Sequence, residues 1–418
     1  MVKFMKLIYM SIIIITGILL SVTNSEGQTS GCTDPQALNY NSSATVNDGS
    51  CIYNTSSVTP AASYNLVSSL NEPSGLIVWN NQLWTHNDSE DINIYALDTL
   101  NGNIVQSYAI TGTINKDWEE ISQDDEYLYI GDFGNNTNGN RTDLRILRIS
   151  KISIFANTLE TDEIKFSYSG QTDFTAAGAN NTDFDCEAFI VSNDSIYLFT
   201  KQWISKKTSV YSLPKTPGTY QAKKKYTYNV DGLITGATCL QSKQLIVLCG
   251  YSNLLEPFIF LLYDFNGFDF FGGNKRKISV SLPYHQIEGI ATNDGLKYFL
   301  INENFTYQTY LNIPQKLHIL NLNPFLESYL ESVSSVKDNT GNDHYTVYPV
   351  PSGNVITVKS GTMLQNETFH IINYTGQTLM AGKMKGDEYH IDISSLPCGL
   401  YILKIGNKSC QRFIIIRK

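Results

Sequence analysis

The chain has 418 residues, of which 12% are aromatic and only 17% are charged. These values suit a folded protein of two or three domains and exclude an intrinsically disordered chain. The formal net charge of −9 argues against a nucleic-acid partner. The many Tyr, Gly, Asn and Thr residues favour strands and tight turns, so the composition predicts an all-β protein.

The first residues have the features of a secretory signal peptide. Lys3 and Lys6 form a basic start, and an apolar run extends from Leu7 to Val22. Small residues follow the run and allow cleavage, so residues 1–27 are predicted to be a removed signal peptide. A retained membrane anchor is an alternative, although the run is short for a spanning helix. A lipoprotein built on Cys32 is another.

A short unit follows at residues 31–53. It is too small to bury a core, so it needs a covalent or metal staple. Its start, Gly31-Cys32-Thr33-Asp34-Pro35, resembles a small module found in secreted Bacteroidetes proteins. A disulfide between Cys32 and Cys51 would stabilise it by roughly 3 kcal/mol. Its hard oxygen donors suit Ca²⁺, or else they only order turns; they are Asp34, Asn39, Asn41, Asn47 and Asp48.

Residues 63–325, after a linker at 54–62, carry a repeated unit of an apolar anchor, a turn and a strand with a polar end. The spacing of the anchors is that of β-propeller blades, and the polar stretch 170–185 explains the one long interval. A further blade is expected from both ends of the region, with 317–320 pairing near 64–67. The prediction is a six-bladed propeller, with anchors at Leu76, Ile121, Phe189, Thr238 and Ile290.

Three repeats place a carboxylate two residues before the anchor, at Glu119, Glu187 and Glu288. Equivalent blade positions converge on the central channel, and carboxylates held close together need a cation or protons. Ca²⁺ accepts such an oxygen cluster. The other two repeats have Ser74 and Gly236 there, so a full ring of acids is absent. Each Glu could instead order a turn by accepting backbone N–H bonds.

Two segments resemble the signature of propellers in the esterase-like phytase and gluconolactonase-type group. They are Asp117-Trp118-Glu119-Glu120-Ile121 and Gly131-Asp132-Phe133-Gly134-Asn135-Asn136. The resemblance implies that Asp132, Asn135 and Asn136 are strand-end ligands, with turn formation as the alternative role. It also implies metal-dependent hydrolysis of a phosphoester or lactone as one possible activity.

Other catalytic motifs are missing from the sequence. It has no Gly-x-Ser-x-Gly, no His-Glu-x-x-His and no phosphate-cradling Gly-rich loop, which disfavours serine-hydrolase and zincin chemistry. His86 and His285 are further titratable candidates, with a structural role as the alternative.

After a linker at 326–344, residues 345–418 start with Tyr345-Thr346-Val347-Tyr348-Pro349 and close with Arg412-Phe413-Ile414-Ile415-Ile416. They resemble the C-terminal sorting domain of type IX secretion cargo. The resemblance implies a small immunoglobulin-like β-sandwich, a contact with that secretion machinery and removal of the domain after export. It also implies a secreted or outer-surface location, where lipid attachment would be the link to a membrane.

The sequence therefore predicts an exported propeller that binds a ligand or a metal ion. A Ca²⁺-dependent hydrolase acting in the channel and a structural adhesion scaffold are the alternatives.

Overall fold

The computed structural model describes residues 28–155, 159, 161–338, 345–350, 352–373, 377–405 and 409–416. The chain divides into two compact units between Ser328 and Tyr329. The predicted signal peptide lies outside the described residues. In the described part, no helix has the length and apolar character needed to cross a membrane.

The small N-terminal module contains a parallel strand pair, β1 (Ser30–Gly31) and β2 (Val46–Asn47). Cys32 and Cys51 form the predicted disulfide, with their Cα atoms 4.9 Å apart. The segment predicted as a linker continues along the propeller, because β3 (Ser57–Val58) pairs in parallel with β20 (Asn274–Val280). The disulfide therefore closes the module, and the pairing of β3 with β20 holds the following segment against the propeller.

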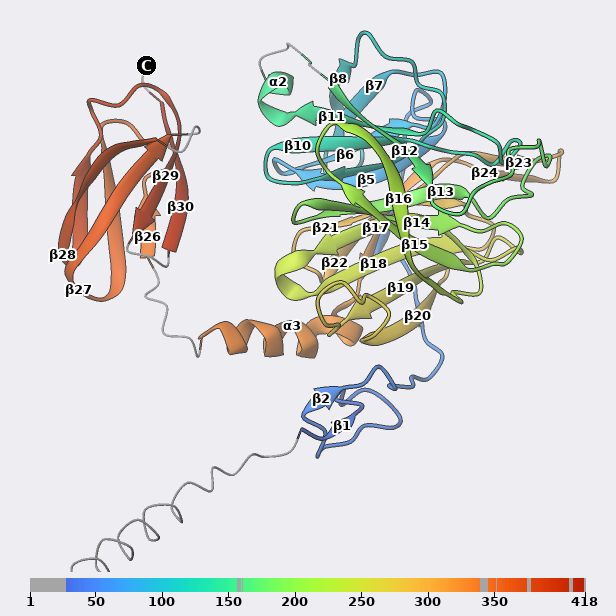
Figure 1. Cartoon of the computed structure of the whole chain (residues 1–418), viewed down its shortest axis with the longest axis horizontal. Helices are drawn as coiled ribbons and strands as arrows, with labels where there is room; N and C mark the ends of the chain where they lie inside the picture. The colour runs from blue at the N-terminus through green and yellow to red at the C-terminus, as the bar shows by residue number, and fades with distance from the viewer. Residues whose placement is uncertain are drawn as a thin grey trace, which may run out of the picture. The chain divides into compact units, whose positions relative to one another are not determined.

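The main domain consists of antiparallel blades of four strands each (Figure 1). Blade 1 has β5 (Pro73–Trp79), β6 (Gln82–Asn87), β7 (Asn93–Leu97) and β8 (Ile104–Ala109). Blade 2 has β9 (Trp118–Gln123), β10 (Tyr127–Asp132), β11 (Arg145–Ser150) and β12 (Thr161–Tyr168). Blade 3 has β13 (Asp185–Ser192), β14 (Ser195–Lys201), β15 (Thr208–Pro214) and β16 (Gly218–Tyr228).

Blade 4 has β17 (Leu233–Leu240), β18 (Leu245–Tyr251), β19 (Pro257–Tyr263) and β20 (Asn274–Val280). Blade 5 has β21 (Ile287–Thr292), β22 (Lys297–Asn302), β25 (Lys316–Asn321) and, from the N-terminal side, β4 (Ala62–Asn65). Short additions are the helix α2 (Lys151–Phe155), the 3-10 helix η1 (Gln241–Lys243) and the hairpin β23 (Phe305–Tyr307) and β24 (Leu311–Ile313).

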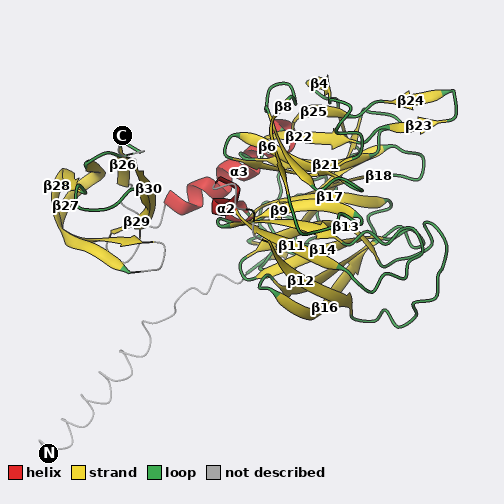
Figure 2. Ribbon diagram, turned by 90° about the horizontal axis from the view of Figure 1, so that it is seen from above, coloured by secondary structure: helices red, strands yellow, loops and turns green. Residues whose placement is uncertain are grey.

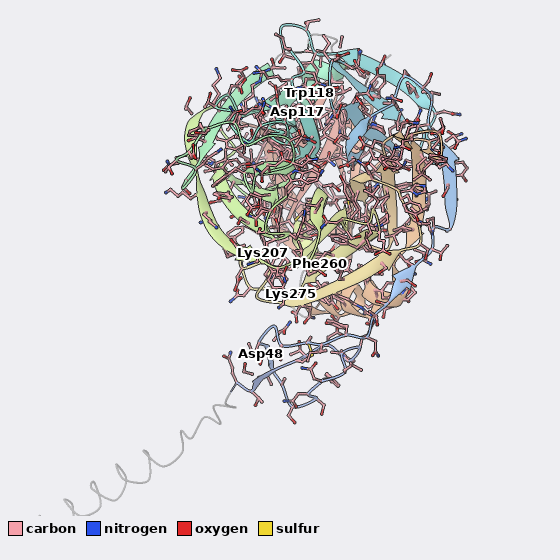
Figure 3. The ribbon with its side chains drawn as sticks, turned by 90° about the vertical axis from the view of Figure 1, so that its right-hand side faces the viewer. Asp48, Asp117, Trp118, Lys207, Phe260 and Lys275 are labelled. Atoms are coloured by element: carbon pink, nitrogen blue, oxygen red, sulfur yellow. A yellow bond between two sulfur atoms is a disulfide. The ribbon has the colours of Figure 1, made fainter. Side chains whose placement is uncertain are left out.

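The inner strands β5, β9, β13, β17 and β21 pack against one another in a closed ring, and the blades surround this centre (Figure 3). Strands near the centre are buried on both faces. This burial explains their nearly continuous apolar sequences, such as Leu245–Tyr251 in β18. Clusters of buried aliphatic and aromatic side chains fill the space between neighbouring blades. The propeller class predicted from the repeats is therefore confirmed.

The predicted blade number is wrong: the described residues 62–321 form five blades. The expected pairing of the two ends does occur, since Leu317 lies opposite Tyr64 and Ile319 opposite Ala62. These strands complete the blade that begins at β21, so they add no sixth one. Each apolar anchor marks one inner strand, and five anchors mean five blades.

The long spacing between the second and third anchors has two structural sources. Blade 2 contains α2 before its outer strand, and the predicted polar stretch forms the loop 169–184 between β12 and β13. The outer strands β12 and β16 also pair in parallel, from Ile164 opposite Gly218 to Tyr168 opposite Ala222. Blades 2 and 3 therefore share one eight-stranded sheet.

Helix α3 (Asn323–Asp338) occupies much of the predicted second linker (Figure 2). The C-terminal unit then contains β26 (Tyr345–Tyr348), β27 (Val355–Asn373), β28 (Thr378–Asp392), β29 (Gly399–Ile405) and β30 (Ser409–Ile415). The long β27 pairs with β26, β28 and β29, and apolar side chains from all five strands form one core. This all-β, sandwich-like unit agrees with the prediction.

Candidate functional site

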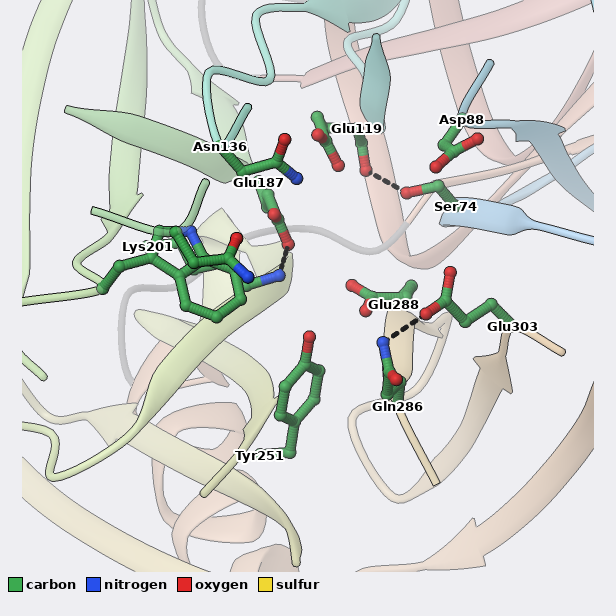
Figure 4. A pocket seen from close by; sticks show the side chains of 12 residues that line it. Ser74, Asp88, Glu119, Asn136, Glu187, Lys201, Tyr251, Gln286, Glu288 and Glu303 are labelled. Atoms are coloured by element: carbon green, nitrogen blue, oxygen red, sulfur yellow. Dashed lines mark hydrogen bonds and ion pairs between the residues drawn. The ribbon is translucent and has the colours of Figure 1, made fainter. Parts of the chain in front are cut away.

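A cavity of about 200 Å³ lies where the inner strands begin, and acidic side chains from four blades line it (Figure 4). Glu119 comes from β9, Glu187 from β13 and Glu288 from β21. The three glutamates that the repeat singles out therefore line one pocket. Ser74, from β5, also lines it.

Each of these glutamates is the extra residue of a β-bulge in its inner strand. The ladder between β13 and β14 skips Glu187, and the ladder between β21 and β22 skips Glu288. Glu119 likewise has no partner across β9 and β10. A bulge turns the side chain of an unpaired residue away from the regular alternation. The recurring bulge therefore explains how the repeated glutamates reach a common centre.

In blade 4 the residue skipped in the ladder is Thr235. Gly236, the residue two positions before the apolar anchor of this repeat, follows it directly. The Thr235 side chain is fully buried and its hydroxyl donates a hydrogen bond to the carbonyl oxygen of Ile287. Blade 4 therefore contributes no carboxylate at this position.

Glu119, Asp185 and Glu187 bring one carboxylate oxygen each to within 4.8 Å of one another. Their side chains are almost fully buried, with residue exposures of 6%, 0% and 2%. Asp185 was not among the predicted site residues. A signal for it exists in the sequence, since Asp185-Cys186-Glu187 has the same spacing as Asp117-Trp118-Glu119.

The Asp185 carboxylate accepts three hydrogen bonds, one of them from the backbone N–H of its neighbour Cys186 at 3.1 Å. The backbone N–H of Asn135 donates to its Oδ1 atom at 2.7 Å, and Nε1 of Trp203 donates to its Oδ2 atom at 2.7 Å. In contrast, no hydrogen bond or ion pair joins the Glu119 carboxylate to another described residue. Gly134 leaves the space for it, because a Cβ atom there would lie 2.1 Å from Oε1 of Glu119.

Burial raises the pKa of Glu119 well above its ordinary value, and the charges of Glu187, Asp117 and Asp185 raise it further. Burial also raises the pKa of Glu187, although Lys201 opposes that shift. Lys201 is itself buried, which disfavours its charged form, but Glu187 beside it holds the pKa of Lys201 well above its usual range. One ammonium therefore faces a larger group of carboxyl groups.

A second acidic group forms the other side of the pocket, which blades 1 and 5 provide (Figure 4). Burial raises the pKa of Glu288 to about 8, that of Glu303 to about 7 and that of Asp88 to about 8. The side-chain amide of Gln286 donates a hydrogen bond to Glu303. At neutral pH these carboxyl groups hold part of their protons, so they can both donate and accept hydrogen bonds.

Glu120 is buried at the centre of the ring and joins three blades. Its carboxylate accepts backbone N–H bonds from Leu76 at 3.3 Å, Ile121 at 3.0 Å and Ala237 at 2.8 Å. Gly75, whose φ is +65°, leaves room for it, since a Cβ atom there would lie 2.8 Å from Oε1 of Glu120. This glutamate has the hydrogen-bonding role that the sequence offered as the alternative for its neighbour Glu119.

Two of the predicted ligands point elsewhere. The carboxylate of Asp132 forms ion pairs with Arg141 at 2.8 Å and Arg145 at 2.9 Å. The side-chain oxygen of Asn135 accepts the backbone N–H of Arg141 at 2.9 Å. Asn136 does line the pocket. The two arginines neutralise Asp132, and neither Asp132 nor Asn135 is among the residues that line the pocket.

In the N-terminal module, the side-chain oxygens proposed as Ca²⁺ ligands each accept a backbone N–H. The pairs are Asp34 with Gln36, Asn39 with Ile52, Asn41 with Ser43, Asn47 with Gly49 and Asp48 with Ser50. The module also bonds to blade 4. Its Asp34 accepts the hydroxyl of Tyr263 at 2.6 Å, and the Asn47 amide donates to Asp264 at 2.8 Å. A metal site in this module stays a prediction.

The two histidine candidates lie outside the residues that line the pocket. His86 is fully buried, with its ring edge-on to Trp118, and burial lowers its pKa to about 4. His285 is packed against His318, and burial lowers its pKa as well. Both are therefore neutral residues of the structure at physiological pH.

Fold and site together define a five-bladed propeller with an acidic pocket at its centre, joined to a sandwich-like C-terminal unit. Residues 346–417 match the model of the secretion system C-terminal sorting domain. This match confirms the sorting domain that the tail predicts. The domain indicates type IX secretion cargo, which is exported to the cell surface or secreted.

No curated protein matches the chain. Among solved structures it is similar to glutaminyl cyclase of Myxococcus xanthus, with 11% identity, a TM-score of 0.38, and coverage of 63% of this chain and 98% of that one. PorZ, a surface component of the type IX secretion system of Porphyromonas gingivalis, has 12% identity and a TM-score of 0.29; 82% of this chain matches 45% of PorZ.

An exo-β-1,3-galactanase of Phanerochaete chrysosporium has 8% identity, a TM-score of 0.41, and coverage of 85% of this chain and 97% of that one. At these identities and TM-scores, none of the three likenesses bears on the activity of this chain.

Proposed function

We propose that the exported propeller binds a divalent cation that prefers oxygen ligands, with Ca²⁺ as the first candidate. Glu119, Asp185 and Glu187 are the proposed protein ligands. The observation that carries the proposal is the approach of three nearly buried carboxylate oxygens to within 4.8 Å of one another. Buried carboxylates at this separation repel one another unless protons or a cation neutralise them.

The chemistry of the ligands favours a hard cation. All three are carboxylates, and neither His nor Cys belongs to the group, which suits Ca²⁺ or Mg²⁺ better than Zn²⁺. Ca²⁺ takes about six to eight oxygen ligands, so water or a bound ligand would complete its shell from the cavity.

Lys201 supports the same assignment. Its ammonium contacts Glu187 from a position with a side-chain exposure of 4%, and so partly neutralises the group. A dication supplies twice the charge of one ammonium. We therefore expect cation binding to move Lys201 away from Glu187 and towards Glu288 or Tyr251, whose negative or polar groups lie within its electrostatic reach.

Calorimetric titration of the purified chain with CaCl₂ tests the proposal. Glu119→Gln and Asp185→Asn each remove a ligand charge while keeping the side-chain shape, and we expect at least about a tenfold loss of affinity, which corresponds to roughly 1.4 kcal/mol. Asp162→Asn is the matched control, because Asp162 pairs with Arg148 on the outer strands, away from the pocket. Unchanged affinity in Glu119→Gln would rule out the assignment.

A second candidate function is Ca²⁺-dependent hydrolysis of a phosphoester or lactone. It is favoured by the free space beside Glu119 and Glu187 and by the partly protonated Glu288, which could transfer a proton to a bound substrate. Assays on both substrate classes, with Ca²⁺ and with a chelator, test it. Activity that survives in both Glu119→Gln and Glu288→Gln would exclude this site.

A further inference from the structure

Large apolar side chains are exposed on loops at the end of the propeller that holds the pocket. Six of them are at least half exposed: Ile114, Ile204, Leu254, Tyr284, Tyr307 and Tyr310. We call these six residues the rim. Their loops also supply the pocket wall, since Ile204 follows Trp203 and Tyr284 lies two residues before Gln286. Exposed apolar surface of this kind, beside a polar pocket, marks interaction sites.

Strand direction places all six rim residues on one face of the propeller. Inner strands start at the pocket, and each second strand returns to it, as Lys201 and Glu303 show at the ends of β14 and β22. Loops after second strands and before inner strands therefore share the pocket face. Fewer exposed apolar side chains lie in the turns of the opposite face, and one of them, Phe268, stacks on Tyr197.

Two of the rim loops are joined by a hydrogen bond. The backbone N–H of Tyr284 donates to the carbonyl oxygen of Leu255 at 2.8 Å, which links the loops of blades 4 and 5. Both residues have positive φ angles, of 66° and 56°, a strained conformation for bulky side chains. Hairpin β23–β24, which carries Tyr307 and Tyr310, extends beyond the blades (Figure 2). The bond between Tyr284 and Leu255 therefore fixes the loops of blades 4 and 5 relative to each other.

The half of the pocket formed by blades 1 and 5 has an excess of acid. Asp88, Glu288 and Glu303 line it, whereas the Lys201 ammonium is bonded to Glu187 of blade 3. The Oδ1 atom of Asp88 is buried and has no hydrogen-bond partner among the described residues. This half therefore favours a ligand group that donates hydrogen bonds and carries positive charge, since such a group stabilises the ionised carboxylates.

We propose that the pocket face docks a polypeptide segment in which a lysine, flanked by apolar residues, inserts its ammonium among Asp88, Glu288 and Glu303. The ammonium offers three donors on a thin apolar stem, which fits a cavity of about 200 Å³. Rim residues come from blades 2 to 5, so the bound chain crosses the mouth and continues on both sides. The proposed cation ligands belong to blades 2 and 3, so the two groups of carboxyl groups lie on different sides of the same cavity.

Fluorescence anisotropy with labelled synthetic peptides tests this inference. The probe has a central lysine between leucine and valine residues, and its two controls carry acetyl-lysine or norleucine at the centre. We expect the purified full chain to bind the lysine probe at least about tenfold more tightly than either control, which corresponds to about 1.4 kcal/mol. Equal binding of the three peptides, or no binding of the lysine probe, would overturn the proposal.

Two double variants distinguish the contribution of the acidic groups to peptide binding from that of the rim. Asp88→Asn combined with Glu303→Gln should weaken the lysine probe about tenfold and leave both controls unchanged. Leu254→Ser combined with Tyr310→Ser changes two exposed side chains, so the fold should be retained. This variant should weaken the binding of all three peptides by one common factor. A lysine probe that binds the first variant as tightly as the native chain would contradict the assignment. Ca²⁺ titration of the same samples reports separately on the cation site.

Discussion

The ammonium of Lys201 contacts the carboxylate of Glu187 in the central pocket, and the side chains of both residues are less than 5% exposed. Lys201 comes from the end of β14 and Glu187 from the bulge of β13, so one hairpin supplies both partners. The surrounding carboxyl groups outnumber this ammonium. The pair therefore neutralises the pocket only in part, which is the basis of the proposed cation site.

Replacing Lys201 with methionine is expected to destabilise the fold in the absence of divalent cations. Loss of one partner leaves Glu187 buried without its counter-ion, and such changes cost about 3–5 kcal/mol in the charged state. Protonation of Glu187 reduces this cost at low pH. Urea unfolding with chelator should detect the loss, and CaCl₂ should recover most of it. The control is the double variant Lys201→Met with Glu187→Gln, which also removes the carboxylate that lost its counter-ion. A Lys201→Met protein that Ca²⁺ does not stabilise would contradict the proposed cation site.

Stability without cations should fall as the pH rises from 5 to 8. Burial raises the pKa of Glu288 to about 8, so the folded chain keeps this proton where the unfolded chain has lost it. The folded state then binds more protons, and the free energy of unfolding decreases with pH across this window. One such group contributes up to about 1.4 kcal/mol per pH unit.

The measurement is urea unfolding at pH 5, 6.5 and 8 with chelator present. Glu288→Gln should flatten the dependence, whereas Glu126→Gln, at an exposed position just before β10, should leave it unchanged. A native chain that is more stable at pH 8 than at pH 5 under these conditions would be inconsistent with the raised pKa values.

Glu120→Ala is expected to destabilise the propeller by about 2–4 kcal/mol, because three buried backbone N–H groups from three blades would lose their acceptor. Glu120→Gln keeps one acceptor oxygen and should cost less. Thermal unfolding of both variants, beside Glu126→Ala as an exposed control, measures the difference. Equal melting temperatures for Glu120→Ala and the native chain would show that this carboxylate does not join the blades.

Removing the Cys32–Cys51 disulfide by two serine substitutions should destabilise the N-terminal module by roughly 3 kcal/mol. Because the module bonds to blade 4 through Asp34 and Tyr263, Tyr263→Phe should loosen its docking without unfolding it. Limited proteolysis between residues 28 and 56 is the readout. Cleavage rates that match those of the native chain in both variants would argue against a docked, stapled module.

Deletion of residues 345–418 should leave the chain in the periplasm of a Bacteroidetes host, whereas the full chain reaches the surface or the medium. The expectation follows from the sorting domain at residues 346–417. Cell fractionation with an antibody to the propeller measures the outcome. The expectation fails if both chains are found in the same compartment.

Much of this organisation could be read from the sequence because it repeats locally. Apolar anchors mark the inner strands, and the preceding glutamates share a bulge that brings Glu119, Glu187 and Glu288 to one cavity. The blade number was overestimated because the fifth blade takes its outer strand from Ala62–Asn65, at the far end of the domain. Sequence spacing cannot tell a completed blade from a new one.

The finer details of the site depend on tertiary pairing. Asp132 has the pattern of a strand-end ligand, yet Arg141 and Arg145 occupy its oxygens. Asp185 was overlooked because it precedes the repeat position, although its spacing from Glu187 copies that of Asp117 from Glu119. Which carboxylate stays free and which is ion-paired is decided by side chains from neighbouring loops, and the repeat does not record them.

A crystal structure of the purified chain grown with CaCl₂ tests the central claim most directly. We expect one ion in the pocket, with oxygens of Glu119, Asp185 and Glu187 at about 2.3–2.6 Å and with Lys201 displaced from Glu187. A pocket without an ion, in which Lys201 still contacts Glu187 at millimolar Ca²⁺, would contradict it.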